Sequence, residues 1–310
     1  MRCVVILAIL LSCVTVMNSN AAHNGRKQLS PQECAAYVYA YPGNIPILLT
    51  APHGGREFIQ GMQGRRYGVT ATDLNTLPMI KIVRDIMRTE YDCVPYVVGA
   101  YFSRKYIDAN RSARSAYEDE NAREIYNAYH RQIALYIQEM KNKFPDNHPL
   151  LVDIHGQSAY PDTIFRGTRN TKTLQDLLKV AGEDAVIGAE SILGVLHKYG
   201  YRVFPSLTSI TEQEHRSYDG GFTVYTYGSH CKQGINAVQL EFGSQLRTKD
   251  QLRCTARDFA YALDVFNRRW QMRTTTPKKK LTLGVTLLGS LSWILYHVCF
   301  EPRSSGMRSG

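Results

Sequence analysis

The pattern that most constrains the fold is an alternation of short, continuous apolar runs with longer amphipathic segments between residues 30 and 270. The apolar runs have the length of strands and cover residues 45–51, 94–101, 149–154, 201–204 and 235–242. The amphipathic segments have helical spacing and cover residues 77–87, 125–140, 174–197 and 248–270. Strands that are apolar on both faces need helices on both sides. The sequence therefore predicts a three-layer αβα fold with a mixed, mostly parallel central sheet.

The two ends of the chain differ from this pattern and predict a role in targeting. Residues 1–22 combine Arg2, an apolar stretch and a small-residue end, which is typical of a secretory signal peptide. Residues 281–300 contain no charged side chain and are long enough to span a membrane. We therefore expect a signal peptide (1–22), a folded domain (28–273), a basic linker (274–280), a transmembrane segment (281–300) and a short tail (301–310).

Composition narrows the class of protein further. The formal net charge is +10, but no basic run lies within the expected domain, so a nucleic-acid surface is not indicated. The expected location is the secretory pathway, either as a single-pass membrane protein or as a secreted one. Because that compartment is oxidising, the four cysteines of the domain could form up to two disulfides. These cysteines are Cys34, Cys93, Cys231 and Cys254.

Polar residues mark the ends of three predicted strands. His53 follows ILLTA, His155 follows LLVDI, and Glu241 lies within VQLEF. Ligands of α/β sheets bind at the carboxyl ends of the strands. Two histidines and a carboxylate from separate strand ends can make the open, three-ligand site of a catalytic zinc ion. The sequence therefore predicts one zinc site, with a glutamate that could serve as general base.

Six short blocks resemble the N-formylglutamate amidohydrolase family in the same order. They are PHGG (52–55), TATDLNT (70–76), RKYIDANR (104–111), VDIHGQS (152–158), GGFTVYTYG (220–228) and AVQLEFG (237–243). The resemblance covers roughly residues 45–265 and implies a zinc-carboxypeptidase-like fold. It also implies that His53 and His155 bind the metal and that Glu241 is the general base. By the same resemblance, Arg111 holds a substrate carboxylate or the developing oxyanion.

The third metal ligand stays open between two carboxylates. Asp73 lies in a block that matches the amidohydrolases and is expected at the start of a helix, where it could instead be an N-cap. Glu57 lies four residues after His53, in a glycine-rich loop, and could instead be a solvated charge. We prefer Asp73. The resemblance also places Asn110 beside the pocket, and Tyr225 is a candidate for its wall, although tyrosines more often pack in a core.

These observations lead to a functional hypothesis with two alternatives. The hypothesis is a zinc-dependent amidohydrolase that cleaves the amide bond of an N-acyl, including N-formyl, amino acid or a related small anionic amide. The first alternative is a catalytically inactive binding or adhesion ectodomain on the same fold. The second is a zinc carboxypeptidase that acts on peptides. All four of His53, Arg111, His155 and Glu241 are present, which favours an enzyme.

Overall fold

The computed structural model describes residues 29–271. The segments interpreted as signal peptide, linker, transmembrane segment and tail lie outside the described residues, so the structure does not test them. Within residues 29–271, no helix combines the length and the apolar character needed to cross a bilayer.

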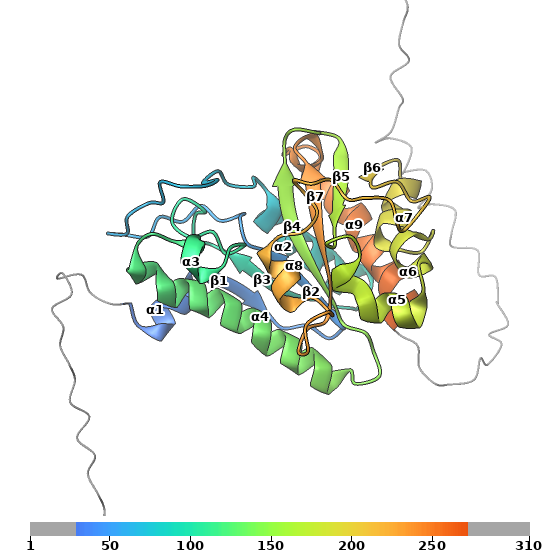
Figure 1. Cartoon of the computed structure of the whole chain (residues 1–310), viewed down its shortest axis with the longest axis horizontal. Helices are drawn as coiled ribbons and strands as arrows, with labels where there is room; N and C mark the ends of the chain where they lie inside the picture. Colours follow the sequence, from blue (N-terminus) through green and yellow to red (C-terminus); the bar gives the residue numbers. More distant parts are fainter. Residues whose placement is uncertain (1–28, 272–310) are drawn as a thin grey trace, which may run out of the picture. The chain divides into compact units, whose positions relative to one another are not determined.

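A seven-stranded sheet forms the centre of the described domain (Figure 1). Its strands are β1 (Val38–Tyr41), β2 (Ile47–Ala51), β3 (Tyr96–Ala100), β4 (Leu150–Gln157), β5 (Thr163–Gly167), β6 (Arg202–Phe204) and β7 (Asn236–Gly243). Their order is β1-β3-β2-β4-β7-β5-β6. The pairs β3/β2, β2/β4, β4/β7 and β5/β6 are parallel, whereas β1/β3 and β7/β5 are antiparallel. The prediction of a mixed, mostly parallel sheet is confirmed.

Helices cover both faces of this sheet, with α4 on one side and α5–α7 and α9 on the other (Figure 1). The helices are α1 (Pro31–Ala36), α2 (Thr76–Glu90), α3 (Ala113–Ala116), α4 (Arg123–Lys143), α5 (Gln175–Ala181), α6 (Asp184–Ile187), α7 (Ile192–Lys198), α8 (Phe222–Tyr227) and α9 (Leu252–Phe266). Short 3₁₀ or π turns lie at Glu120–Ala122, Lys172–Leu174, Gln245–Arg247 and Asn267–Gln271.

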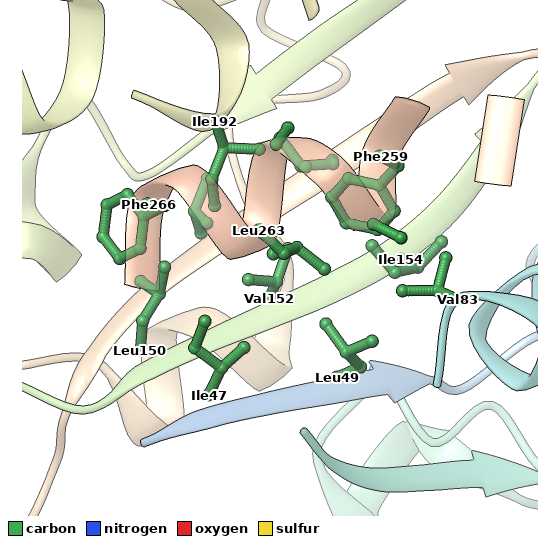
Figure 2. Close-up of a cluster of buried hydrophobic side chains, with 14 of the residues drawn as sticks. Ile47, Leu49, Val83, Leu150, Val152, Ile154, Ile192, Phe259, Leu263 and Phe266 are labelled. Carbon is green, nitrogen blue, oxygen red and sulfur yellow. The ribbon is translucent and has the colours of Figure 1, made fainter. Parts of the chain in front are cut away.

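Side chains of the central strands alternate between two apolar layers. In β4, Leu150, Val152 and Ile154 pack with α2 and α9, as Figure 2 shows for α9. Leu151, between them, packs in the layer of α4 instead. Successive strand residues point to opposite faces, and both faces are covered, which explains why the strands read as continuous apolar runs.

The structure also differs from the sequence-based expectations. The helical segment 174–197 is broken at Gly182, as that glycine predicts, and again at Gly188, which was not predicted, so it forms the three short helices α5, α6 and α7. Strands β1 and β5 and helix α8 were not predicted. Strand β5 contains the buried Arg166, which breaks the apolar run that would have revealed it.

The expected disulfides do not form within the described domain. Cys34, Cys93 and Cys231 are free thiols, so no pair can be made among the four cysteines. Cys34 and Cys93 belong to apolar layers on opposite faces of the sheet.

Candidate metal centre

Two histidines meet at the carboxyl ends of neighbouring parallel strands. His53 follows β2, and His155 lies within β4, which pairs with β2. Both side chains are buried, and their Nδ1 atoms are 3.1 Å apart. The structure therefore brings together the two residues that the sequence predicted as metal ligands.

The other ring nitrogen of each histidine contacts a carboxylate. The Nε2 of His53 is 2.6 Å from Oδ1 of Asp108, and the Nε2 of His155 is 2.8 Å from Oδ2 of Asp153. We assign the ring protons to Nε2 because a carboxylate can only accept. Thr50 in turn donates to Asp153 at 2.5 Å. Both Nδ1 lone pairs then face the same small space, which is how metal-binding histidines are oriented by carboxylates.

Asp73 completes this cluster, and Glu57 does not. Oδ2 of Asp73 lies 3.3 Å from Nδ1 of His155 and 3.4 Å from Nδ1 of His53. Burial alone would raise the pKa of Asp73. The hydrogen bonds with His155 and His53, and the positive charge of these histidines, instead lower this pKa below its ordinary range. The carboxylate is therefore ionised. Glu57 is exposed and is not among the clustered ligands. Its N–H donates to the carbonyl of Tyr101, and its own carbonyl accepts from the N–H of Ser103.

Three ligand atoms from His53, Asp73 and His155 lie within 4.8 Å of one another. Two nitrogen lone pairs and a carboxylate that face each other repel unless a proton or a cation lies between them. Burial alone would lower the pKa of His155, but Asp153 and Asp73 hold it well above its ordinary value. A proton can therefore fill the space, and a divalent cation can replace it. This donor set of two imidazoles and one carboxylate suits zinc with an open coordination position.

Glu241 lies beside this cluster on the next strand. It is the register partner of His155 across the parallel β4/β7 pair, and its side chain is buried. Gln239, two residues earlier on the same face, donates to Glu241 at 3.0 Å. Burial raises the pKa of the Glu241 carboxyl group. Since it is not among the three clustered ligands, Glu241 is available for proton transfer.

The metal-ligand cluster lies in a cleft of the surface, and Asn110 and Arg111 are among the residues that line this cleft. Oδ1 of Asn110 accepts from the N–H of Thr223, and its Nδ2 is 3.2 Å from Nε2 of His155. That nitrogen already donates to Asp153, so the Asn110 amide N–H groups stay available to a ligand. Arg111 is exposed and donates to the carbonyl of Asn110 at 3.0 Å. Its position thus allows contact with a ligand in the cleft.

The structure does not bring Tyr225 into the cleft wall. Its side chain is 45% exposed and lies beside the cationic groups of Lys172 and Arg169. The tyrosine among the residues that line the cleft is Tyr218. The block that contains Tyr225 forms α8, and its contribution to the site comes from the backbone of Gly221 and Thr223.

Several residues of the site were missed by the sequence-based reasoning. Asp153 could have been found, because the spacing Asp-x-His puts both side chains on one face of a strand. Asp108 lies in the block that contains Arg111, and its carboxylate contacts His53 and Arg104. Arg104 is buried and links Asp108 to Asp73. Only the folded chain shows the contacts of Asp108 with His53 and of Arg104 with Asp73, which cross 55 and 31 positions of sequence.

The cluster opens into a cleft of about 890 Å³. The residues that line it include the acidic Asp73, Asp219 and Glu241. Five arginines also line it: Arg104, Arg111, Arg169, Arg216 and Arg247. A cleft of this size and charge suits a ligand that carries negative charge.

Comparison with known proteins supports the fold. The sequence matches no protein-family model and no curated protein. The fold is similar to the crystal structure of N-formylglutamate amidohydrolase from Ralstonia eutropha JMP134, with a TM-score of 0.53 and 15% identity. This match covers 76% of the present chain and 99% of that chain. The expected likeness in fold is therefore confirmed over most of the chain.

Two further structures superpose less closely. A gene product of Agrobacterium tumefaciens has a TM-score of 0.49 at 16% identity, over 73% of this chain and 93% of that chain. A bacteriophage poly-gamma-glutamate hydrolase has a TM-score of 0.34 at 14% identity, over 73% of this chain and 86% of that chain. At such values the superpositions carry no argument about the present site.

Proposed function

We propose that the chain is a zinc-dependent amidohydrolase that cleaves the amide bond of an N-acyl amino acid or a related small, anionic amide. The observation that carries this proposal is the arrangement of His53, Asp73 and His155, with two Nδ1 atoms and a carboxylate facing one space. The N-formylglutamate amidohydrolase of similar fold supports the choice of an amide as substrate.

The residues present fit one zinc ion. His53, Asp73 and His155 would hold it, and Asp108 and Asp153 would keep both imidazoles in the required tautomer. A zinc ion at this site supplies Lewis acidity, which makes water a better nucleophile at neutral pH and polarises a carbonyl group.

The side chains around the cluster have distinct tasks in this proposal. Glu241 takes the proton of the attacking water and passes it to the leaving amine. Its raised pKa brings it closer to the working pH of such a base. The free N–H groups of Asn110 and the exposed guanidinium of Arg111 bind and orient the substrate carboxylate. Water and amide thereby meet in a fixed geometry.

Metal analysis and a substrate panel test the proposal together. Purified protein should contain about one zinc ion and should hydrolyse at least one of N-formyl- and N-acetyl-glutamate, -aspartate and -alanine. Glu241→Gln should keep the metal and lose activity by about 10²- to 10⁴-fold, since the amide keeps the shape but takes no proton. Glu57→Gln is the matched control and should change neither quantity.

Each other outcome favours a different reading. Bound zinc without hydrolysis of any N-acyl amino acid would favour the inactive ectodomain, and cleavage restricted to longer peptides would favour a carboxypeptidase. Loss of zinc from Glu241→Gln would place Glu241 among the metal ligands.

The location of the protein is a separate proposal, which rests on the sequence alone. We infer that residues 1–22 direct the domain into the secretory pathway and that residues 281–300 anchor it in the membrane. Expression of the full chain in a eukaryotic cell tests both points. N-terminal sequencing should show a start near residue 23, and alkaline carbonate should leave the protein in the membrane pellet. A soluble, uncleaved protein would contradict both inferences.

A further inference from the structure

Arg166 on β5 is the largest of the fully buried side chains in the described domain. Its Nε donates to Oε1 of Glu214 at 3.0 Å. Its Nη1 and Nη2 atoms are buried as well and have no hydrogen-bond partner among the described residues. A guanidinium group has five N–H donors and stays charged in proteins. Four donors of a buried cation therefore remain to be satisfied.

Glu214, the partner of Arg166, is satisfied mainly by a neighbouring loop. Its carboxylate also accepts from the N–H groups of Thr168 and Asn170 and from the hydroxyl of Thr168. These donors share its negative charge with Arg166. Buried charges are costly unless they have both a counter-charge and hydrogen bonds for their remaining donors. Glu214 therefore meets only part of what the buried guanidinium group requires.

Arg166 points away from the metal centre. In the antiparallel β5/β7 pair, Arg166 lies opposite Leu240, whereas Phe165 lies opposite Glu241. Successive strand residues point to opposite faces of a sheet. Arg166 therefore shares the face of Leu240, which belongs to the apolar layer with α9. Its guanidinium group takes no part in the proposed metal site.

A small cavity of about 30 Å³ lies on this face, and Arg166 is one of the residues that line it. The other ten lining residues are leucine, isoleucine, valine, alanine or phenylalanine, and all are buried. Figure 2 shows three of them, Leu150, Ile192 and Phe266. Arg166 is thus the one polar side chain in the wall of the cavity.

The composition of this wall indicates what the cavity can hold. Its volume suits one water molecule or one monatomic ion. A water molecule that accepts from Arg166 brings two O–H donors of its own, and the apolar side chains of the wall offer them no acceptor. A halide ion only accepts. The fixed fork of one guanidinium group presents Nη1 and Nη2 side by side, so both can donate to the same ion.

We propose that this cavity is a binding site for one chloride ion, which accepts hydrogen bonds from Nη1 and Nη2 of Arg166. Glu214 acts as a positioning residue, because its bond to Nε fixes the plane of the guanidinium group. The ion supplies the acceptor that the protein itself does not offer to the two terminal nitrogens.

The dependence of thermal unfolding on the anion tests this site. The protein is unfolded in sodium chloride and in sodium gluconate of equal ionic strength, since gluconate is too large for the cavity. An ion that binds only the folded chain raises the Tm by mass action. At a chloride concentration about five times the dissociation constant, the Tm should be about 2–4 °C higher than in gluconate.

Variants connect this response to the cavity. Arg166→Met/Glu214→Gln removes both charges but keeps an acceptor for the loop, and its Tm should not depend on chloride. Ala185→Val fills part of the cavity while Arg166 and Glu214 stay intact, and it should also lose the response. Arg202→Met is the matched control, because this arginine is 74% exposed and pairs with Asp162. It should respond to chloride as the wild type does.

Bromide can replace chloride and locates the ion by its anomalous scattering. Crystals of the wild-type protein in sodium bromide should show one anomalous peak in the cavity, within hydrogen-bonding distance of both Nη1 and Nη2 of Arg166. Density there without an anomalous signal would identify a water molecule and overturn the proposal. A bromide peak with a Tm that does not depend on chloride would mean an adventitious ion only, which also overturns it.

A chloride response that persists in both Ala185→Val and Arg166→Met/Glu214→Gln would place the ion elsewhere and contradict the site. None of these measurements depends on zinc or on amide hydrolysis. The chloride site and the proposed function can therefore fail independently of each other.

Discussion

The two faces of the central sheet are built from the same strands but have different roles. Toward α2 and α9, the side chains of Leu150, Val152 and Ile154 in β4 and of Val238, Leu240 and Phe242 in β7 are apolar and buried. Toward α4, the strands begin with Leu151 and Ala237 and then change to polar residues. These polar residues are Thr50, Asp153, His155, Gln239 and Glu241.

The difference indicates that the apolar face contributes most to the stability of the fold, whereas the polar face holds the groups that could bind a metal and react. The apolar face is a packed layer that any well-fitting aliphatic set could fill. The polar face holds buried charges that are bonded to each other, and such groups contribute little net stability. Substitutions on the first face should therefore change the free energy of unfolding, and substitutions on the second should change metal binding and turnover.

The largest effect is expected at the first metal ligand. His53→Ala should abolish zinc binding and lower activity by at least about 10³-fold, because two remaining ligands do not hold the ion. Zinc per protein and hydrolysis of the best N-acyl substrate are the measurements. A variant with full zinc occupancy would show that this histidine is not a ligand.

The apolar face should respond in the opposite way. Leu263 on α9 is fully buried in the apolar layer that also contains Val152 and Leu150 (Figure 2). Leu263→Ala should lower the free energy of unfolding by about 3 kcal/mol, through lost burial and a new cavity. Urea unfolding measures this loss, and zinc content of the folded protein should stay the same. If zinc binding fell as much as stability, the two faces would not be separable.

A smaller effect is expected for Asp153, which contacts the ring nitrogen of His155 that does not face the metal site. Asp153→Asn removes the carboxylate that orients His155 and should weaken zinc affinity by about 10- to 100-fold. Competition with a chelator of known affinity measures the change. Asp162→Asn is the control and should have no effect, because Asp162 is paired with Arg202 and its side chain is 45% exposed. Unchanged affinity in Asp153→Asn would mean that the protein backbone alone orients the ring.

The smallest effect concerns acid stability of the cleft face. His130 on α4 donates from Nε2 to the carbonyl of Ala109 and accepts at Nδ1 from the Tyr227 hydroxyl. Burial lowers the pKa of His130 to about 4. The unfolded chain, with an ordinary pKa near 6.5, takes up the proton first as pH falls. Stability should therefore be complete above about pH 6.5 and should decline toward pH 4.

This loss should amount to about 2 kcal/mol between pH 6.5 and 4.5. Urea unfolding of the wild type and of His130→Gln over that range isolates it, because all other groups titrate in both proteins. The variant should be less stable at pH 7 but should lose less on acidification. Parallel curves would show that His130 is not the group responsible.

The sequence predicted the layers and part of the site for a physical reason. Strands buried on both faces read as apolar runs, and a histidine at the end of such a run is conspicuous. Asp108 was not identified because its bond to His53 depends on how a loop folds 55 residues away. The sequence favoured Asp73 over Glu57 but left Glu57 open as an alternative. The loop that contains Glu57 is fixed by backbone bonds to Tyr101 and Ser103, which no side-chain pattern reveals.

One feature of the centre constrains how this chain can change over time. Arg247 donates hydrogen bonds to the backbone carbonyls of Leu74, Gln157 and Phe242. These three residues lie within two positions of Asp73, His155 and Glu241, respectively. A Cβ at position 156 would lie 2.3 Å from the centre of that guanidinium group. A side chain at Gly156 would therefore displace the guanidinium group of Arg247 from these three carbonyls. Among diverging descendants, these two positions should either both persist or be exchanged together, although they are 91 residues apart.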